Sequence, residues 1–388
     1  MRYIDQEEIK NKRVLLRVDY NVSLDKRHHI GNDERILQSL PTIKYLLKSN
    51  NTVILLSHLG RPHGKERSLS LEPVATRLHE FLPDVAVNFI TDLESLPREN
   101  MRNSLLNQLF LLENLRFFPG EDSNDKNFAK QLATHGDVYV NDAFSVSHRK
   151  TASIIGLPML LPSYAGLLMK KEVESISKAT ENPKHPFVAI LGGAKISTKI
   201  ALISKLIDIA DVVLLGGGLA NTFLLALNIQ IGKSLVEPSE IANAKKLLKL
   251  AHDKKTKLLL PTDVMVGDKE GRHTTLKSVQ SVLKHDQIFD IGPETQAIYG
   301  QAILQAKTII WNGPVGYFET EAYRRGTDFI YYSIAAVSDV ISIVGGGETI
   351  AAISNKDHLE KITHISTGGG AMLEFIENGT LPGIESLS

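Results

Sequence analysis

Short runs of hydrophobic residues alternate with longer, partly polar segments along the whole chain. The runs are rich in Val, Ile and Leu, which is typical of strands buried on both faces of a parallel sheet. They predict strands at residues 14–18, 52–57, 109–112 and 137–140 in the first half, and at 187–191, 212–215, 257–261, 308–311 and 340–344 in the second. Between them, apolar residues recur at helical spacing, for example at residues 35–49, 73–81, 241–252 and 295–305. This alternation predicts βαβ units, and therefore an α/β fold of parallel sheets covered by helices.

The chain is too long, at 388 residues, for one ordinary hydrophobic core, so we expect two domains. Proline and glycine interrupt the pattern near residues 157–165, and a helix predicted at 164–178 would lead into the second domain. We therefore place an N-terminal domain at residues 1–165 and a C-terminal domain at residues 166–377.

Composition narrows the class of protein. Hydrophobic residues make up 43% of the chain and charged residues 23%, as in a soluble globular protein. The formal net charge is zero, so we expect no general attraction to nucleic acid or to a membrane surface. The absence of cysteine excludes disulfides, a thiolate nucleophile and cysteine-ligated metal. Residues 1–12 are polar and no apolar run is long enough to span a membrane, so we expect a cytoplasmic protein.

The predicted strands of the two halves end in different kinds of residue. In the first half the residues after the strands are polar or basic: Asp19, Asn21, His58, Arg61, Arg116, Asn141, Asp142, His148 and Arg149. In the second half they are mostly glycine: Gly192, Gly193, Gly216, Gly217, Gly218, Gly313, Gly345, Gly346, Gly347, Gly368, Gly369 and Gly370. Ligands of open parallel sheets bind beyond the carboxyl ends of the strands. The sequence therefore predicts a cationic crevice in one domain and a glycine-lined crevice in the other.

The stretch at residues 188–199 lies near the middle of the chain and combines three features of a phosphate site. A buried strand runs into Gly192 and Gly193, and the apolar residues that follow predict a helix. On such a helix Lys195 and Lys199 would lie one turn apart on the same face. Backbone N–H groups, a helix N-terminus and two cations suit a phosphate. The alternative is a plain strand-to-helix turn with two solvated lysines.

Three glycine triplets each follow a predicted strand, and they predict a nucleotide site. Glu348 and Thr349 directly follow the triplet at residues 345–347, and a carboxylate and a hydroxyl there suit a nucleotide with Mg²⁺. Each triplet alone could be a tight turn, but three at strand ends favour phosphate binding. The spacing of a P-loop is absent before Lys233, and the dinucleotide spacing G-x-G-x-x-G is absent at Gly192 and Gly216. These absences count against a P-loop enzyme and a dehydrogenase.

Four arginines near strand ends or early in a helix predict a small, multiply charged anion as the second ligand. They are Arg35, Arg61, Arg116 and Arg149. Asp19 and Asn21 would orient the hydroxyl groups of that anion or one of the arginines, and His58 could be a ligand or an ordinary hydrogen-bonded histidine. Phosphate on one domain and an anion on the other imply phosphoryl transfer, with Arg35 and Lys199 serving the migrating group. A carboxylate acceptor is ionised at neutral pH and needs no general base.

The motifs of the chain resemble those of the phosphoglycerate kinase family, in the family's order and over nearly the whole length. They are RVDYNV at 17–22, SHLGRP at 57–62, LENLRF at 112–117, VNDAF at 140–144, LGGAK at 191–195, WNGPVGYFE at 311–319, GGGET at 345–349 and STGGG at 366–370. The resemblance implies two Rossmann-like domains joined by a helix and a hinge, with residues 378–388 packing back on the N-terminal domain. It also implies reversible transfer from 1,3-bisphosphoglycerate to Mg-ADP, which gives 3-phosphoglycerate and ATP in glycolysis, by in-line transfer after hinge closure.

The resemblance assigns individual residues. Those implied for phosphoglycerate are Asp19, Asn21, Arg35, His58, Arg61, Arg116 and Arg149. Those implied for the nucleotide are Gly192, Lys195, Lys199, Gly216, Gly217, Asn312, Glu319, Gly345, Gly346, Gly347, Glu348 and Thr349. Those implied for the transferring group are Arg35, Lys199, Gly346 and Gly369. The chain departs from the family at Glu348, where the family has a metal-binding Asp, and lesser departures lie at Ser23, Thr198, Ser145 and Val146.

Three hypotheses follow for the function. The first is an active, monomeric phosphoglycerate kinase that uses Mg²⁺. The second is a catalytically weakened homologue that binds nucleotide in a regulatory or scaffold role, and it rests on Glu348, because one extra methylene moves the carboxylate. The third is another ATP-dependent carboxylate kinase.

Overall fold

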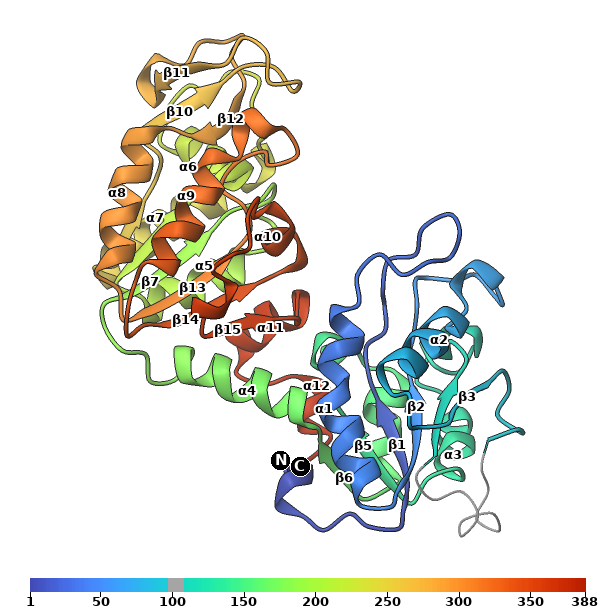
Figure 1. The fold of residues 1–388 in the computed structure, drawn as a ribbon. Helices are drawn as coiled ribbons and strands as arrows, with labels where there is room; N and C mark the ends of the chain where they lie inside the picture. The colour runs from blue at the N-terminus through green and yellow to red at the C-terminus, as the bar shows by residue number, and fades with distance from the viewer. Residues whose placement is uncertain (97–107) are drawn as a thin grey trace. The chain divides into compact units, whose positions relative to one another are not determined.

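The computed structural model describes residues 1–96 and 108–388, which form two compact units (Figure 1). Unit 1 comprises Met1–Glu174 and Thr380–Ser388, and unit 2 comprises Ser175–Gly379. The chain passes from unit 1 to unit 2 within helix α4 (Leu167–Thr180). The division lies nine residues beyond the sequence-based limit at residue 165, because the first half of α4 packs with unit 1.

Unit 1 is built on one sheet of six parallel strands in the order β3-β4-β2-β1-β5-β6. The strands are β1 (Arg13–Arg17), β2 (Thr52–Leu56), β3 (Val87–Ile90), β4 (Leu109–Leu112), β5 (Val138–Asn141) and β6 (Ser163–Ala165). Every residue of β1 is buried, and Val14 lies between Val53 and Val138 of the neighbouring strands. Continuous apolar runs are what a sheet covered on both faces requires.

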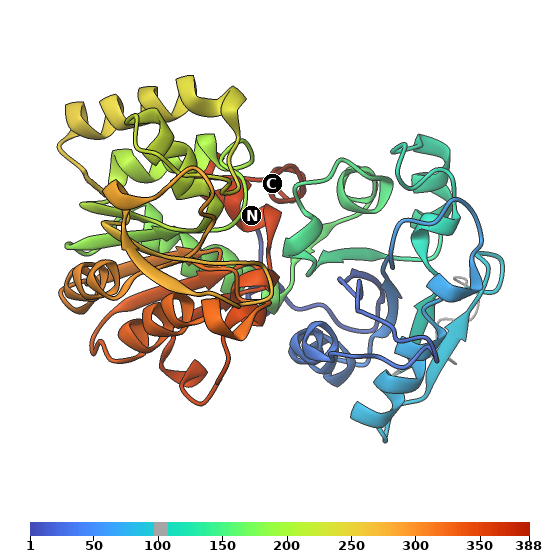
Figure 2. The same cartoon turned by 90° about the horizontal axis from the view of Figure 1, so that it is seen from above.

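Helices cover both faces of this sheet (Figure 2). Helices α1 (Glu34–Lys48) and α2 (Glu72–Phe81) pack their apolar sides on one face, and α3 (Lys126–Ala133) lies on the other. Alternate strand residues such as Val14 and Leu16 share a core with Ile43 of α1 and Leu78 of α2. The start of α3 is set locally, because the Asp125 carboxylate accepts the backbone N–H of Phe128 at 2.8 Å.

Unit 2 repeats this plan with a second sheet of six parallel strands in the order β15-β14-β13-β7-β8-β9. The strands are β7 (Phe187–Leu191), β8 (Val212–Leu215), β9 (Lys257–Leu259), β13 (Thr308–Asn312), β14 (Ile341–Gly345) and β15 (His364–Ser366). The helices are α5 (Ile200–Ile209), α6 (Gly217–Ala226), α7 (Ile241–Lys254), α8 (Pro293–Leu304), α9 (Arg325–Ala335), α10 (Gly347–Ala352) and α11 (Gly370–Asn378). Figure 2 shows α7 on one face of the sheet and α8 and α9 on the other. The α/β fold of two parallel sheets is confirmed.

A small antiparallel sheet in unit 2 was not expected from the sequence. Its order is β11-β10-β12, and its strands are β10 (Asp263–Val266), β11 (Thr275–Ser278) and β12 (Ile288–Ile291). The sheet is tied to α8 by Asp263, whose carboxylate accepts the backbone N–H groups of Glu294 at 3.0 Å and Thr295 at 2.7 Å. Asp263 thus serves as a remote cap for a helix whose own N-cap, Gly292, has no side chain.

Two sequence-based elements need correction. The helix expected at 164–178 begins at Leu167, because Ser163–Ala165 instead pairs with β5 as the edge strand β6. Asp142 accepts the backbone N–H groups of Leu168 at 2.9 Å and Met169 at 3.1 Å, which fixes the helix start. The strand expected at 257–261 ends at Leu259.

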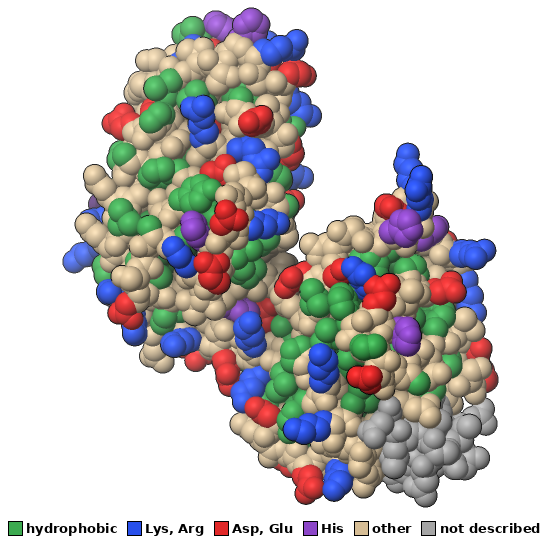
Figure 3. Space-filling view, in the orientation of Figure 1, with side chains coloured by type: hydrophobic (Ala, Val, Ile, Leu, Met, Phe, Trp, Pro, Cys, Tyr) green, Lys and Arg blue, Asp and Glu red, His purple; other side chains and the backbone are tan. Residues whose placement is uncertain are grey.

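Residues 380–388 return to unit 1 and pack against it through helix α12 (Pro382–Glu385). The backbone N–H of Gly383 donates to the carbonyl of Ser147 at 2.8 Å, and the Ser386 hydroxyl donates to the carbonyl of Ile154 at 3.2 Å. Acidic and basic side chains are interspersed on the face shown in Figure 3. Within the described residues, every helix is too short or too polar to cross a bilayer.

Candidate active site

The predicted anion-binding residues of unit 1 follow four neighbouring strands, β4, β2, β1 and β5. Asp19 and Asn21 follow β1, His58 and Arg61 follow β2, Arg116 lies in the turn after β4, and Arg149 follows β5. Because the strands are parallel, their carboxyl ends lie on the same edge of the sheet. The fold thus brings these residues to one edge, as the sequence predicts.

Arg35 lies in the first turn of α1 and pairs with Asp19. The Asp19 carboxylate accepts hydrogen bonds from the Arg35 guanidinium, from the Ser145 hydroxyl and, at 2.9 Å, from the backbone N–H of Asn21. The Asp19 side chain is 10% exposed and that of Arg35 is 34% exposed, so the arginine still faces solvent. Asp19 therefore orients Arg35, and Ser145 helps to hold the carboxylate.

His58 is buried among the arginines of this edge. Burial lowers the pKa of His58 well below its ordinary value, and the positive charges of Arg17, Arg116, Arg149 and Arg35 lower it further. The imidazole is therefore neutral at neutral pH. Of these arginines, Arg17 makes a direct contact, because its Nη2 lies 3.3 Å from Nδ1 of His58.

Arg116 links the loops that follow two strands of this edge. Its guanidinium donates to the carbonyl of Gly60, and its Nε lies 3.5 Å from a carboxylate oxygen of Asp122. The amide oxygen of Asn21 accepts the backbone N–H of Gly60 at 2.9 Å. Arg61, by contrast, is exposed. The loops after β1, β2 and β4 are thus joined by polar contacts.

In unit 2 the glycine turns follow the neighbouring strands β14, β13, β7 and β8. They pack closely: a Cβ at Gly192 would lie 2.0 Å from the carbonyl oxygen of Pro314, and Gly217 has a φ of +66°. The N–H of Gly193 donates to Pro314 at 2.8 Å, and that of Gly217 donates to Val315 at 2.9 Å. This differs from the expectation that these N–H groups face a phosphate, because they hold the turns together instead.

The two later triplets match the expectation better, because each begins a helix with open space beside its start. Gly346, with a φ of +96°, is the N-cap of α10, and Gly369, with a φ of +52°, is the N-cap of α11. A Cβ at Gly347 or Gly370 would meet nothing within 4 Å, so open space lies beside both helix starts. These starts leave room for a phosphate group to approach the backbone.

Lys195 and Lys199 do not share a helical face, so that prediction is wrong. Helix α5 begins at Ile200, and Lys199 is its N-cap. A residue distant in sequence contacts the segment between the two lysines. The Glu237 carboxylate accepts hydrogen bonds from the Ser197 hydroxyl at 2.6 Å and from the Ser197 backbone N–H at 3.0 Å. This contact holds the segment before α5 out of helical geometry.

Lys199 is partly buried, whereas Lys195 is exposed. The Lys199 ammonium donates to the carbonyl of Gly192 at 2.8 Å and to that of Asn312 at 3.4 Å. Burial lowers the pKa of Lys199 to about 8, and the nearby negative charge of Glu348 acts in the opposite direction. Lys199 is therefore a cation held at the glycine turns, close to Glu348.

Asn312 and Thr349 connect the turns after β13 and β14. The Asn312 side-chain amide donates to the carbonyl of Gly345 at 2.9 Å. The Thr349 hydroxyl donates to the same carbonyl at 2.7 Å and accepts the N–H of Gly313 at 2.7 Å. The sequence suggested that this hydroxyl serves a nucleotide–metal group, but in the structure it is buried and occupied by backbone partners.

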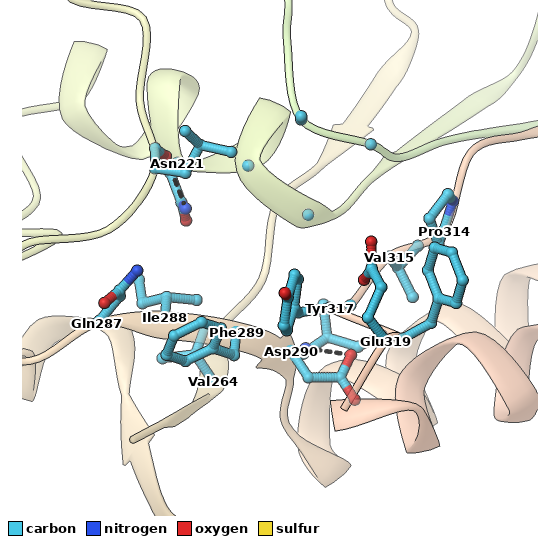
Figure 4. A pocket seen from close by; sticks show the side chains of 18 of the residues that line it. Asn221, Val264, Gln287, Ile288, Phe289, Asp290, Pro314, Val315, Tyr317 and Glu319 are labelled. Carbon is cyan, nitrogen blue, oxygen red and sulfur yellow. Dashed lines mark hydrogen bonds between the residues drawn. The ribbon is translucent and has the colours of Figure 1, made fainter. Parts of the chain in front are cut away.

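A pocket of about 410 Å³ opens beside these turns (Figure 4). Its lining includes the predicted residues Gly217, Glu319 and Glu348 and the apolar side chains of Val264, Ile288 and Phe289. Asn221 of α6 lies across the pocket from Phe289 of β12, and Glu319 lies toward the end at Val315 and Pro314 (Figure 4). The arrangement suits a flat apolar ring against the β12 side and polar or charged groups toward the glycine turns.

Sequence reasoning missed several residues of this pocket, including Phe289 and Asp290. Asp290 is 2% exposed and accepts the backbone N–H groups of Ile291 at 2.9 Å and Gly326 at 2.8 Å. Burial raises the pKa of Asp290 to about 8. One feature of the sequence could have revealed Asp290. It is a carboxylate near the end of an apolar run, and the run is followed by Gly292 and Pro293, as other predicted strands are followed by glycine.

The carboxylates near the pocket show whether its lining suits Mg²⁺. Across residues 1–96 and 108–388, no three His, Asp or Glu side chains gather as a metal cage. Glu348 is exposed and lines the pocket. Mg²⁺ is usually held by one or two carboxylates together with substrate phosphates, so a single carboxylate beside this pocket fits the ion.

Comparison with known proteins identifies the family. The family model described as phosphoglycerate kinase matches residues 4–379. Phosphoglycerate kinase from Dictyoglomus turgidum is 48% identical over 385 residues, which cover 98% of this chain and 96% of that protein. The structure of phosphoglycerate kinase from Coxiella burnetii has a TM-score of 0.90 at 40% identity and covers 99% of this chain and 97% of that one. The structure of phosphoglycerate kinase from Pyrococcus horikoshii has a TM-score of 0.82 at 32% identity, and the match covers 100% of this chain and 98% of that one.

The fold and these comparisons together define a kinase of the two-domain α/β class. The chain belongs to the phosphoglycerate kinase family. The resemblance seen in the motifs is confirmed, as is the expectation of an enzyme. None of the comparisons favours the alternative of a weakened, nucleotide-binding homologue.

Proposed function

We propose that unit 1 binds the phosphoglycerate and unit 2 binds the nucleotide in the reaction of this family. In that reaction a phosphoryl group passes reversibly between 1,3-bisphosphoglycerate and ADP, giving 3-phosphoglycerate and ATP. The observation that carries the assignment is that His58, Arg116 and Arg149 follow neighbouring parallel strands at one edge of the unit 1 sheet, where Asp19 also holds Arg35. Guanidinium groups bind phosphate and carboxylate oxygens through paired hydrogen bonds, so this edge suits a triply charged small molecule.

The proposed phosphoglycerate ligands are Asp19, Asn21, Arg35, His58, Arg61, Arg116 and Arg149. The proposed nucleotide ligands are Gly192, Lys195, Lys199, Gly216, Gly217, Asn312, Glu319, Gly345, Gly346, Gly347, Glu348 and Thr349. For Gly192, Gly216, Gly217 and Thr349 the role is indirect, since their polar groups hold the turns. The acceptor carboxylate is already ionised, so catalysis needs positioning and charge neutralisation rather than a base.

Arg35 and Lys199 are proposed to neutralise the migrating phosphoryl group, one from each unit. Both are partly buried and held by neighbours, Arg35 by Asp19 and Lys199 by the Gly192 carbonyl. A charge held in advance costs little reorganisation when the transition state forms. The N-cap positions Gly346 and Gly369 begin helices whose first-turn N–H groups would face the same oxygens.

Mg²⁺ is proposed as the cofactor, bound by Glu348 together with nucleotide phosphates. When bound, the ion neutralises phosphate charge and orients the nucleotide. The exposed Glu348 carboxylate beside the pocket supports this assignment.

The decisive experiment is a kinase assay of the purified protein in both directions. With Mg²⁺ we expect ATP from 1,3-bisphosphoglycerate and ADP, and ADP from 3-phosphoglycerate and ATP. Chelation should abolish both, and added Mg²⁺ should restore them. The variant Arg35→Ala should lose activity, while Arg67→Ala, which removes an exposed arginine of unit 1, should not. No transfer in either direction would overturn the proposal, and transfer to another carboxylate alone would favour a different carboxylate kinase.

The protein is further proposed to act as a cytoplasmic monomer. Each unit has its own core, and the sites proposed here draw on one chain. Light scattering should give the mass of a single chain at assay concentration. A dimer whose activity is lost on dilution would contradict this proposal.

A further inference from the structure

Arg17 is a buried cation in unit 1 that the proposed reaction does not use. It is the last residue of β1 and is 2% exposed. Its Nε donates to the Ser153 hydroxyl at 2.8 Å, and one terminal nitrogen, Nη1, donates to the carbonyl of Val18. The other terminal nitrogen, Nη2, lies 3.3 Å from Nδ1 of His58. One arm of this buried guanidinium is thus directed at a proposed substrate-binding side chain.

The contact between Arg17 and His58 decides where the proton of the imidazole resides. A guanidinium has only N–H donors and no acceptor. Nδ1 of His58 must therefore accept the hydrogen bond with its lone pair. A neutral imidazole with a free lone pair on Nδ1 carries its proton on Nε2. A doubly protonated ring would lose the hydrogen bond and set two positive charges side by side.

Arg17 is itself held in place by a short chain of hydrogen bonds. The Ser153 hydroxyl accepts from Arg17, so its single proton is free to go to Glu121 Oε1 at 2.6 Å. The backbone N–H of Ser153 donates to the other Glu121 oxygen at 3.0 Å. Glu121 is 2% exposed, so its buried negative charge offsets the buried charge of Arg17. The chain from Glu121 through Ser153 to Arg17 gives the guanidinium one preferred orientation.

A neutral His58 can donate a hydrogen bond at this edge of the sheet without adding a positive charge. Arg35, Arg116 and Arg149 already supply positive charge near the ring. A further cation among them would be repelled, whereas a neutral N–H donor adds a hydrogen bond to a bound anion without repulsion. A neutral ring with its proton on Nδ1 could not donate from Nε2.

We propose that Arg17 is a positioning residue that holds His58 as the neutral tautomer protonated on Nε2, so that His58 binds phosphoglycerate as an N–H donor and not as a cation. The use of this donor for phosphoglycerate rests on the proposed function, whereas the tautomer does not. Arg17 acts only through His58 and touches no substrate.

The tautomer can be measured directly in the ligand-free, full-length protein. Long-range ¹H–¹⁵N spectra of the ¹⁵N-labelled protein distinguish a bare ring nitrogen from a protonated one, and His58→Gln assigns the signals. At pH 7 we expect a bare Nδ1 and a protonated Nε2 in the wild type. In Arg17→Met we expect the two nitrogens to shift toward a mixture of tautomers. A protonated Nδ1 in the wild type, or an unchanged His58 signal in Arg17→Met, would overturn the proposal.

Arg13 provides a matched control in the same strand. It is 4% exposed and pairs with Asp137 at 2.9 Å, so Arg13→Met also removes a buried, paired arginine. We expect this control to leave the His58 signals unchanged. If Arg17→Met does not fold, the double variant Arg17→Met with Glu121→Gln removes both buried charges together, and Glu121→Gln alone is its reference. A tautomer shift in Arg13→Met equal to that in the Arg17 variant would also overturn the proposal.

Binding of 3-phosphoglycerate, measured by calorimetry, separates this inference from the proposed function. Loss of one hydrogen bond predicts binding about tenfold weaker in Arg17→Met than in the wild type. If the wild type does not bind 3-phosphoglycerate, the proposed function fails while the tautomer result stands. If the wild type binds and Arg17→Met binds equally well despite a changed tautomer, the role assigned to the His58 donor is wrong.

Discussion

Two lysines four residues apart, Lys195 and Lys199, differ more in environment than in sequence. Lys195 is exposed, whereas the Lys199 ammonium is held by the carbonyl of Gly192 at 2.8 Å. This difference could not be predicted from the spacing, because it depends on Glu237, which holds Ser197 from 40 residues along the chain. The motif marks the lysines as candidates, but only the fold distinguishes a buried cation from a solvated one.

The burial of Lys199 predicts a pH dependence of the reaction. Burial lowers the pKa of Lys199 to about 8, so the ammonium is charged below that pH and becomes neutral above it in the free enzyme. The value of kcat/KM for Mg-ATP should therefore fall as the pH rises above about 8. Lys199→Arg keeps its charge at this pH and should lose the alkaline decline, whatever its overall rate. The same decline in Lys199→Arg would show that another group titrates.

Substitution by alanine should affect KM at Gly347 but stability at Gly192. A Cβ at Gly347 meets nothing within 4 Å, whereas one at Gly192 would lie 2.0 Å from the carbonyl oxygen of Pro314. Gly347→Ala should keep the unfolding temperature and raise KM for Mg-ATP about tenfold, because the methyl group takes space proposed for a phosphate. Gly192→Ala should destabilise the protein.

Gly64→Ala is the control for Gly347→Ala, since a Cβ there also meets nothing within 4 Å. Steady-state kinetics and thermal unfolding of the three variants provide the measurement. An unchanged KM in Gly347→Ala would exclude close approach of a phosphate at this residue.

At the scale of elements, the central strands of the two parallel sheets were predictable, whereas the edge strands β3 and β6 and the small antiparallel sheet were not. Strands such as β1 and β7 are buried along their full length, so their apolar runs are continuous and easily recognised. Strand β11, by contrast, is largely exposed, and it shows no apolar run. Strand β6 has three residues, and its pairing with β5 depends on tertiary context.

The same reasoning applies to the candidate site. Residues that follow long parallel strands, such as Asn21 and Glu348, were found from their position in the sequence. Residues contributed by the antiparallel sheet, such as Phe289 and Asp290, were missed because that sheet was missed. Ser145 was noted only as a departure from the family, although its hydroxyl contacts Asp19.

The cap of α8 by Asp263 predicts a specific loss of stability. Asp263 is 5% exposed and accepts the N–H groups of Glu294 and Thr295. Asp263→Ala leaves both groups without this partner and should lower the free energy of unfolding of unit 2 by about 2 kcal/mol. Asp208→Ala, which breaks a half-exposed ion pair with Lys254, should cost less than about 1 kcal/mol.

The single tryptophan makes the measurement of this loss specific to unit 2. Trp311 is fully buried in the core of that unit, so its fluorescence during urea unfolding reports unit 2 separately from unit 1. Equal midpoints for Asp263→Ala and the wild type would show that the cap contributes little.

At the scale of the whole molecule, the proposed sites lie in different units, and transfer requires the two reactants to reach bonding distance. We predict that solution scattering shows a smaller radius of gyration with nucleotide and 3-phosphoglycerate together than with either ligand alone. The value should move toward about 21 Å, which is expected for one compact body of this length. A radius unaffected by the second ligand would count against domain closure.

The return of residues 380–388 to unit 1 has a consequence for the order in which the protein is made. Residues 1–174 of unit 1 leave the ribosome before unit 2, yet unit 1 lacks α12 until all of unit 2 has been synthesised. Until then, the carbonyl of Ser147 lacks the Gly383 N–H that it accepts in the finished protein. Unit 2, which is continuous in sequence, can complete its fold before unit 1 does. The domain whose synthesis starts first is thus the one completed last, and a released chain that ends at Gly379 would carry a complete unit 2 beside an incomplete unit 1.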